Sequence, residues 1–272
     1  MNSISVPSHF GKRRKNADLW RGAACAVPAQ LDCRTNHCSR SGRDGPCHNR
    51  SNANPITPLH ASPLALITAL LLCGLVLPLL GQETRNVLIL GDSLADGSGV
   101  NRSQAFPSLL QEKIDSAKLP FKIINAGVSG DTSAGGLRRI DWLLRRKTDV
   151  LLLELGGNDG LRGMSPELTR SNLQGIIDKA KKKQPDIRIV IAGMQMPENM
   201  GKDYAEKFKK VFPDLAKANN CALIPFLLEG IGADPRYNLP DLIHPNPEGH
   251  KIVASTIWKT LEPTLRSFEK AD

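Results

Sequence analysis

Short, continuously apolar runs alternate with longer amphipathic stretches through the last two thirds of the chain. The apolar runs are rich in aliphatic residues and occupy 86–90, 122–126, 149–155, 187–193 and 221–226. Stretches with apolar positions at helical spacing come after them, at 104–117, 133–146, 167–183, 203–218 and 247–268. Strands that are apolar throughout, rather than at alternate positions, are typical of a parallel sheet covered on both faces. Five such βα units in series predict an α/β protein, a three-layer α/β/α sandwich with a five-stranded parallel sheet.

Two segments of different composition precede this regular pattern. Residues 1–61 are rich in Ser, Asn, Arg, Gly and Pro and have neither a helical nor a strand period, so they cannot bury enough apolar surface to fold alone. Residues 62–81 contain no charged side chain, and their length lies between that of a signal-peptide core and that of a membrane span. We therefore expect a disordered or wrongly assigned extension at 1–61, a signal peptide or membrane anchor at 62–82, and a folded domain at 83–272.

The charge around the apolar segment indicates on which side of a membrane the domain lies. Residues 1–82 carry 9 Lys and Arg against 3 acidic residues, all upstream of the apolar run. A basic flank on this side favours a cytoplasmic N-terminus and export of the residues downstream of the run. Leu79 and Gly81 form an imperfect cleavage site, so cleavage and retention both stay open. The domain is expected to be periplasmic or secreted, and anchored if the segment is retained.

Charge and cysteine content exclude two other classes of function. Residues 83–272 carry 27 Lys and Arg against 24 acidic residues, and their densest basic block, Lys181-Lys182-Lys183, lies in a predicted helix where a solvated face is the usual explanation. Cys33 and Cys38 are the only cysteines with ligand-like spacing, and no second pair completes a zinc site. We expect a monomer that binds neither nucleic acid nor a metal.

Polar residues and glycines occur in four clusters, each of which follows one of the predicted strands in the chain. These clusters are 91–94, 125–132, 156–159 and 241–246. In parallel α/β sheets, ligands bind beyond the carboxyl ends of the strands, so the four clusters should converge on one edge of the sheet. Turn formation alone does not explain why each cluster also carries a polar group able to do chemistry. The sequence therefore predicts an active site at this edge.

Histidine narrows the choice of chemistry, because the folded domain contains only two. His250 lies within the last predicted helix, where we expect it to face solvent or to cap. His244 lies on the loop before that helix, with Asp241 three residues earlier and able to orient its ring, although a structural loop hydrogen bond explains such a pair equally well. Ser93 is placed either to cap the first helix after a tight glycine turn or to act as a nucleophile at its N-terminus.

Taken together, these segments resemble the four sequence blocks of the SGNH/GDSL hydrolase superfamily. The residues that carry the resemblance are Gly91-Asp92-Ser93-Leu94, Gly130, Gly156-Gly157-Asn158-Asp159 and Asp241-x-x-His244, in this order within residues 85–268. The strings ILGDSLADG, NAGVSGDTSAGG, ELGGNDGLRG and IHPN are most similar to bacterial periplasmic enzymes described as acyl-CoA thioesterase, lysophospholipase and arylesterase. The resemblance implies that residues 83–272 form a flavodoxin-like SGNH hydrolase domain.

The resemblance also implies a role for each matching residue. Ser93 would attack the acyl carbonyl, with His244 as its base and Asp241 holding His244. The oxyanion hole would consist of the backbone N–H groups of Ser93 and Gly130 and the side chain of Asn158. A serine hydrolase of this kind forms an acyl-enzyme, needs no cofactor, and cleaves small acyl esters, thioesters or lysolipids.

The segment 194–200, after the fourth predicted strand, is a candidate acyl pocket. It contains three methionines, which offer a flexible apolar surface to acyl chains of differing length. We expect Met196 and Pro197 to contact substrate, while filling of the adjacent core explains the same residues equally well.

Two other functions compete with this interpretation. A carbohydrate O-acetylesterase of the same fold would share the mechanism and differ only in its pocket. A membrane-tethered, non-catalytic binding domain has no need for a nucleophile, a base, an orienting acid and oxyanion donors together, so four intact blocks argue against it.

Overall fold

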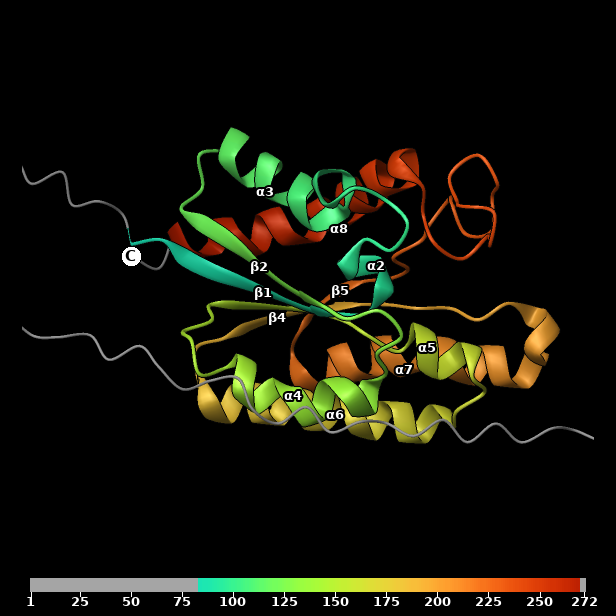
Figure 1. Ribbon diagram of the computed structural model, residues 1–272. Coiled ribbons are helices and arrows are strands. Elements are labelled where there is room, and N and C mark those ends of the chain that lie inside the picture. Colours follow the sequence, from blue (N-terminus) through green and yellow to red (C-terminus); the bar gives the residue numbers. More distant parts are fainter. Residues whose placement is uncertain (1–82, 270–272) are drawn as a thin grey trace, which may run out of the picture. The chain divides into compact units, whose positions relative to one another are not determined.

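The computed structural model describes residues 83–269, which fold around one five-stranded parallel sheet with strand order β2-β1-β3-β4-β5. The strands are β1 (Arg85–Gly91), β2 (Phe121–Gly127), β3 (Val150–Glu154), β4 (Arg188–Ala192) and β5 (Ala222–Ile224). Helices cover both faces of the sheet (Figure 1). The predicted fold class, a three-layer α/β/α sandwich, is confirmed.

Five long helices form the two outer layers. On one face lie α3 (Phe106–Ser116) and α8 (Pro247–Glu269), which pack against each other. On the opposite face lie α4 (Ser133–Leu143), α6 (Pro166–Lys183) and α7 (Lys202–Asn219) (Figure 1). Because both faces of the sheet are covered, every residue of β3 is buried, which explains why the strand is apolar from Val150 to Leu153.

Short elements at the ends of the strands were not predictable from the sequence pattern. The helices α2 (Ser93–Asp96) and α5 (Gly157–Leu161) come after β1 and β3, and the 3₁₀ turns η1 (Arg102–Gln104) and η2 (Glu198–Met200) precede α3 and α7. All four are too short to show a helical period. They differ from the long helices in that two of them, α2 and α5, carry candidate site residues.

Two predicted boundaries shift for identifiable reasons. The fifth strand was expected at 221–226 but ends at Ile224, because the next residue is Pro225, which has no backbone N–H for the ladder. The helix expected from residue 104 begins at Phe106, where Pro107 occupies the first turn, a position that proline tolerates.

His250 lies in the core, so the expectation of a solvent-facing side chain is wrong. Its side chain is 1% exposed because α8 packs against α3. Its Nδ1 accepts a hydrogen bond from the backbone N–H of Phe106 at 3.2 Å, so it caps α3 rather than its own helix. Burial, with a smaller contribution from His244, lowers the pKa of His250 to about 4. The ring is therefore neutral at neutral pH and able to accept that bond.

Several predictions concern residues outside the described range. The extension at 1–61, the apolar segment at 62–81 and the cysteine pair Cys33 and Cys38 all precede residue 83, so the predicted division of the chain stays a prediction. Within residues 83–269, no helix combines the length and the apolar character that crossing a membrane requires.

Candidate active site

The turn from β1 into α2 places Ser93 at the carboxyl edge of the sheet. A Cβ at Gly91 would lie 2.4 Å from Oε2 of Glu154, so only glycine fits where β1 ends. Asp92 then caps α2, its Oδ1 accepting a hydrogen bond from the backbone N–H of Leu94 at 3.0 Å. Ser93 is therefore the first residue of α2, immediately beyond the sheet.

Ser93, His244 and Asp241 form an unbroken chain of hydrogen bonds. The Nε2 of His244 lies 2.9 Å from the Oγ of Ser93, and its Nδ1 lies 2.6 Å from Oδ2 of Asp241. The other carboxylate oxygen of Asp241 accepts the backbone N–H groups of Ile243 at 2.9 Å and His244 at 3.0 Å. Partial burial raises the pKa of Asp241, but the hydrogen bonds from His244 and Ile243 outweigh it and bring that pKa to about 2. Asp241 is therefore ionised at neutral pH and fixes the orientation of the imidazole.

The loop between β5 and α8 holds His244 in place from both sides. The backbone carbonyl of His244 accepts the N–H of Leu239 at 2.8 Å. Two residues later, the N–H of Asn246 donates to the carbonyl of Tyr237 at 2.9 Å, and the side-chain oxygen of Asn246 accepts the N–H of Gly249 in the first turn of α8 at 3.0 Å. His244 thus lies on a loop with little freedom to move.

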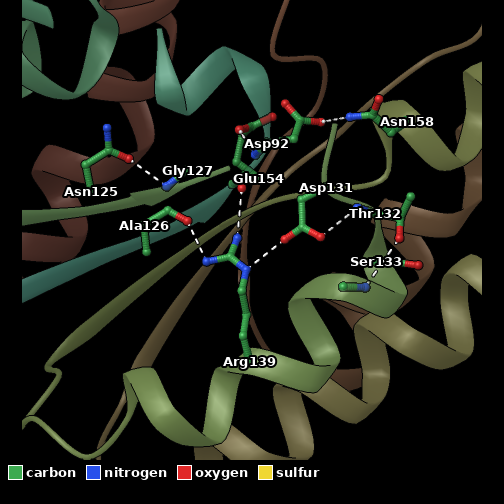
Figure 2. A network of polar contacts seen from close by, with 12 residues as sticks. Asp92, Asn125, Ala126, Gly127, Asp131, Thr132, Ser133, Arg139, Glu154 and Asn158 are labelled. Carbon is green, nitrogen blue, oxygen red and sulfur yellow. Dashed lines mark hydrogen bonds and ion pairs between the residues drawn. The ribbon is translucent and has the colours of Figure 1, made fainter. Parts of the chain in front are cut away.

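The three predicted oxyanion donors lie on the turns after β1, β2 and β3. Asn158 belongs to α5, and its side-chain nitrogen donates to Oδ2 of Asp92 at 3.1 Å (Figure 2). Gly130 has φ +77°, a conformation that favours glycine. Within residues 83–269, no hydrogen-bond acceptor engages the backbone N–H of Ser93 or of Gly130. Both donors are therefore free to bind an incoming oxygen.

A pair of buried carboxyl groups lies directly beneath Ser93. The side chain of Glu154, at the end of β3, is fully buried, and its Oε2 accepts the backbone N–H of Asp92 at 3.2 Å (Figure 2). Burial and the neighbouring carboxyl of Asp92 raise the pKa of Glu154 well above its usual range. Burial raises the pKa of Asp92 to about 6, although hydrogen bonds from Leu94 and Asn158 lower it. Glu154 thus supports the turn at Asp92 through this hydrogen bond, and Asp92 in turn holds Asn158.

Arg139 of α4 ties the loop that carries Gly130 to the sheet. Its guanidinium donates to the carbonyl of Ala126 at 2.6 Å, to that of Gly91 at 3.0 Å and to the carboxylate of Asp131 at 2.7 Å (Figure 2). Asp131 is the residue directly after Gly130 in the chain. The ends of β1 and β2 and the predicted oxyanion loop are therefore held by one side chain.

Asp159 anchors the helix that carries Asn158. Its carboxylate is fully buried and accepts hydrogen bonds from the backbone N–H of Ser133 at 2.8 Å and from the hydroxyl of the same residue. The hydroxyl of Thr169 in α6 lies 3.5 Å away. The position of α5 is therefore set by contacts to α4 and α6.

A cleft of about 500 Å³ opens beside Ser93 and His244. Met196 and Pro197, for which substrate contacts were expected, are among the residues that line it. Met196 packs so closely on Gly160 of α5 that a Cβ there would lie 2.3 Å from its sulfur. Other apolar residues of the lining are Leu94, Leu161, Met194, Phe226, Leu228, Ala233, Leu242 and Ile243. Within the described range, no group of three or more His, Cys, Asp and Glu side chains is arranged to hold a metal ion.

Comparisons with known proteins point to one family. Residues 89–252 match the GDSL-like lipase/acylhydrolase family. Esterase TesA of Pseudomonas aeruginosa is 39% identical over 201 residues, which cover 72% of this chain and 99% of that protein. Thioesterase 1/protease 1/lysophospholipase L1 of Escherichia coli K12 is 38% identical over 182 residues, covering 66% of this chain and 84% of that protein.

Solved structures give the same result. A crystal structure of TesA has a TM-score of 0.63 to this chain at 37% identity and covers 66% of this chain and 99% of its own. A structure of the psychrotrophic esterase EstA from Pseudoalteromonas, inhibited by monoethylphosphonate, has a TM-score of 0.63 to this chain at 30% identity. The match covers 67% of this chain and 99% of the EstA chain. The family match spans more than half of the chain, and the chain therefore belongs to the GDSL-like lipase/acylhydrolase family of ester hydrolases.

Proposed function

We propose that this chain is a serine hydrolase that cleaves carboxylic esters and thioesters through an acyl-enzyme on Ser93. The observation that carries the proposal is the hydrogen-bond chain in the cleft. The Oγ of Ser93 lies 2.9 Å from Nε2 of His244, and Nδ1 of His244 lies 2.6 Å from Oδ2 of Asp241. Nucleophile, base and orienting acid in this arrangement are the requirements of acyl transfer, whatever the fold.

The reaction begins when neutral His244 takes the proton of the Ser93 hydroxyl as Oγ attacks the acyl carbonyl. The other ring nitrogen of His244 remains bonded to ionised Asp241, which stabilises the imidazolium that forms. The tetrahedral intermediate then collapses. His244 returns the proton to the departing alcohol or thiol, which leaves an acyl ester on Ser93. Water, deprotonated by His244, releases the acid in the same way.

Negative charge on the carbonyl oxygen is stabilised by three donors: the backbone N–H groups of Ser93 and Gly130 and the side chain of Asn158. Asp92 accepts one N–H of the Asn158 amide at 3.1 Å, which fixes the plane of the amide and leaves its second N–H for the oxyanion. Donors held in place before the reaction stabilise the transition state without reorganising.

The cleft lining favours an acyl chain over a sugar. Aliphatic side chains and methionines, including Met196, surround the space beside Ser93, and polar groups other than the catalytic ones are few. The relatives named esterase, thioesterase, lysophospholipase and arylesterase support the same substrate class. A family 3 carbohydrate esterase from Clostridium thermocellum has a TM-score of 0.58, but at 22% identity this likeness extends to the fold alone.

A substrate panel tests the proposal. The purified protein should hydrolyse p-nitrophenyl esters and acyl-CoA thioesters with higher kcat/KM than acetylated xylan, and lysophospholipid should also be a substrate. Activity confined to acetylated polysaccharide would favour a carbohydrate O-acetylesterase. No hydrolysis of any substrate would favour the non-catalytic, membrane-tethered binding domain.

We further infer that the domain acts outside the cytoplasm, because an uncharged segment at 62–81 comes after a basic one and ends just before β1. Alkaline phosphatase fused after residue 90 should be active in cells, since this reporter folds only after export. Activity of a cytoplasmic reporter at the same junction, with an inactive phosphatase fusion, would contradict export.

A further inference from the structure

Leu242 combines two unfavourable features within the Asp241–His244 segment. Its φ is +58°, in the left-handed region that a bulky side chain rarely adopts. Its side chain is also 44% exposed, although it is large and apolar. Backbone strain of this kind is typical of functional sites, where the strained conformation contributes to binding or catalysis.

The backbone conformation itself is explained by the triad. The left-handed turn at Leu242 brings the N–H groups of the next two residues, Ile243 and His244, onto one oxygen of Asp241. Those bonds help to hold the orienting carboxylate ionised. The turn needs this conformation, but it does not need a leucine, since glycine or asparagine adopts it at lower cost.

The left-handed conformation of Leu242 is not explained by the end of a helix either. Four non-glycine residues between 83 and 269 have positive φ. Lys118 and Asn220 lie at the C-terminal ends of α3 and α7, where a left-handed residue commonly terminates a helix. Ala233 and Leu242 end no helix, and both line the cleft beside the catalytic serine, but of these two only Leu242 carries a large apolar side chain. The side chain, rather than the backbone, is therefore the feature that requires an explanation.

Exposed apolar surface is concentrated at the same place. Six large hydrophobic side chains are exposed within residues 83–269, and three of them, Leu161, Leu242 and Ile243, line the cleft. They lie on two different segments: Leu161 ends α5, and the other two belong to the catalytic loop. Apolar side chains from both segments thus border the space next to Ser93.

We propose that Leu242, with Ile243, is a specificity-determining wall for a medium or long aliphatic acyl chain, so that the loop that orients His244 also selects the substrate. This inference rests on the proposed function and goes beyond the predicted contacts of Met196 and Pro197. Covering Leu242 with an acyl chain removes its apolar surface from water, and this gain is available only to substrates whose chain is long enough to reach it.

The test compares Leu242→Gly and Leu242→Asn with the wild-type chain. Both residues tolerate the left-handed conformation, so the bonds of Asp241 are kept and Tm should not fall. The measured quantity is the ratio of kcat/KM for p-nitrophenyl decanoate to kcat/KM for p-nitrophenyl acetate. We expect both variants to lower this ratio by about tenfold, the scale set by loss of the leucine's apolar contacts with the longer chain.

Lys118→Gly is the matched control, because it changes an exposed left-handed residue remote from the cleft. Its selectivity ratio should equal that of the wild type. An unchanged ratio in both folded Leu242 variants, including the case in which the two rates fall together, would overturn the inference. Failure of the proposed function has a different signature, since the wild-type chain would then not hydrolyse p-nitrophenyl decanoate, and the ratio could not be measured.

Discussion

Replacing Ser93 with Ala should lower kcat for ester hydrolysis by at least about 10⁴-fold, because no acyl-enzyme can form without the nucleophile. The hydroxyl is removed from a position 2.9 Å from Nε2 of His244, and the backbone donors of the oxyanion hole stay in place. Residual turnover would come from those donors and from substrate binding alone. Steady-state kinetics on p-nitrophenyl butyrate, with Tm measured on the same samples, separates loss of chemistry from loss of fold.

Ser255→Ala provides the matched control for this variant. Ser255 lies on the surface of α8, and its hydroxyl donates to the carbonyl of Lys251 at 2.9 Å. This change removes the same atom from an exposed helix and should leave kcat at the wild-type value. A Ser93→Ala variant that is folded and keeps more than a few per cent of wild-type kcat would show that the nucleophile is another residue.

Replacing Asn158 with Ala should lower kcat by about 10²–10³-fold and change KM little, since an oxyanion donor acts mainly on the transition state. Loss of this amide also leaves Oδ2 of Asp92 without its side-chain donor, at a site where burial already raises the pKa of Asp92 to about 6. Part of the effect on kcat therefore comes from a less ordered turn at Ser93. Rate constants for thioester and oxyester substrates should fall together, because both pass through the same oxyanion.

Asn86→Ala is the control for this change. Asn86 lies near the opposite end of β1, and its side chain donates to the carbonyl of Lys147 at 2.9 Å. The control loses one side-chain hydrogen bond, with a cost in unfolding free energy of about 1 kcal/mol, but should keep its kcat. An Asn158→Ala effect confined to KM would assign the residue to substrate binding or to the turn.

The sequence predicted which segments meet, because continuous apolar strands indicate a parallel sheet and parallel strands bring their carboxyl ends to one edge. Ser93 and His244 are 151 residues apart in the chain and 2.9 Å apart at their side chains. The topology of the sheet brings the two segments together. It does not set the distance between the Ser93 hydroxyl and the His244 ring, which depends on the hydrogen bonds of the loop around His244 and on the tight turn at Gly91.

The groups that support the site were harder to predict. Glu154 had a usable signal, since it is the one charged residue at the end of the run VLLLE and a buried carboxyl is unusual. Arg139 gave no such signal in the sequence, because it adjoins Arg138 in α4. The helical period does not reveal which of these two side chains donates to the backbone carbonyls at the ends of β1 and β2.

Two other features depend on contacts that the hydrophobic pattern does not reveal. His250 was expected to face solvent or to cap, and the packing of α3 on α8 buries it and supplies its hydrogen-bond donor at the start of α3. Nothing in the letters Asp-Leu-Ile-His indicates that Leu242 is left-handed. That conformation brings the backbone N–H groups of Ile243 and His244 within hydrogen-bond distance of one carboxylate oxygen of Asp241.

The central claim, that Ser93 is the nucleophile activated by His244, is tested most directly by covalent labelling. The protein is treated with a p-nitrophenyl alkylphosphonate, whose phosphorus is attacked in place of an acyl carbon, and the modified peptide is located by tandem mass spectrometry. We predict one phosphonyl group, on Ser93, formed in step with the loss of esterase activity and absent from a folded His244→Ala variant. Complete loss of activity with the label on any other residue, or with Ser93 unmodified, would contradict that claim.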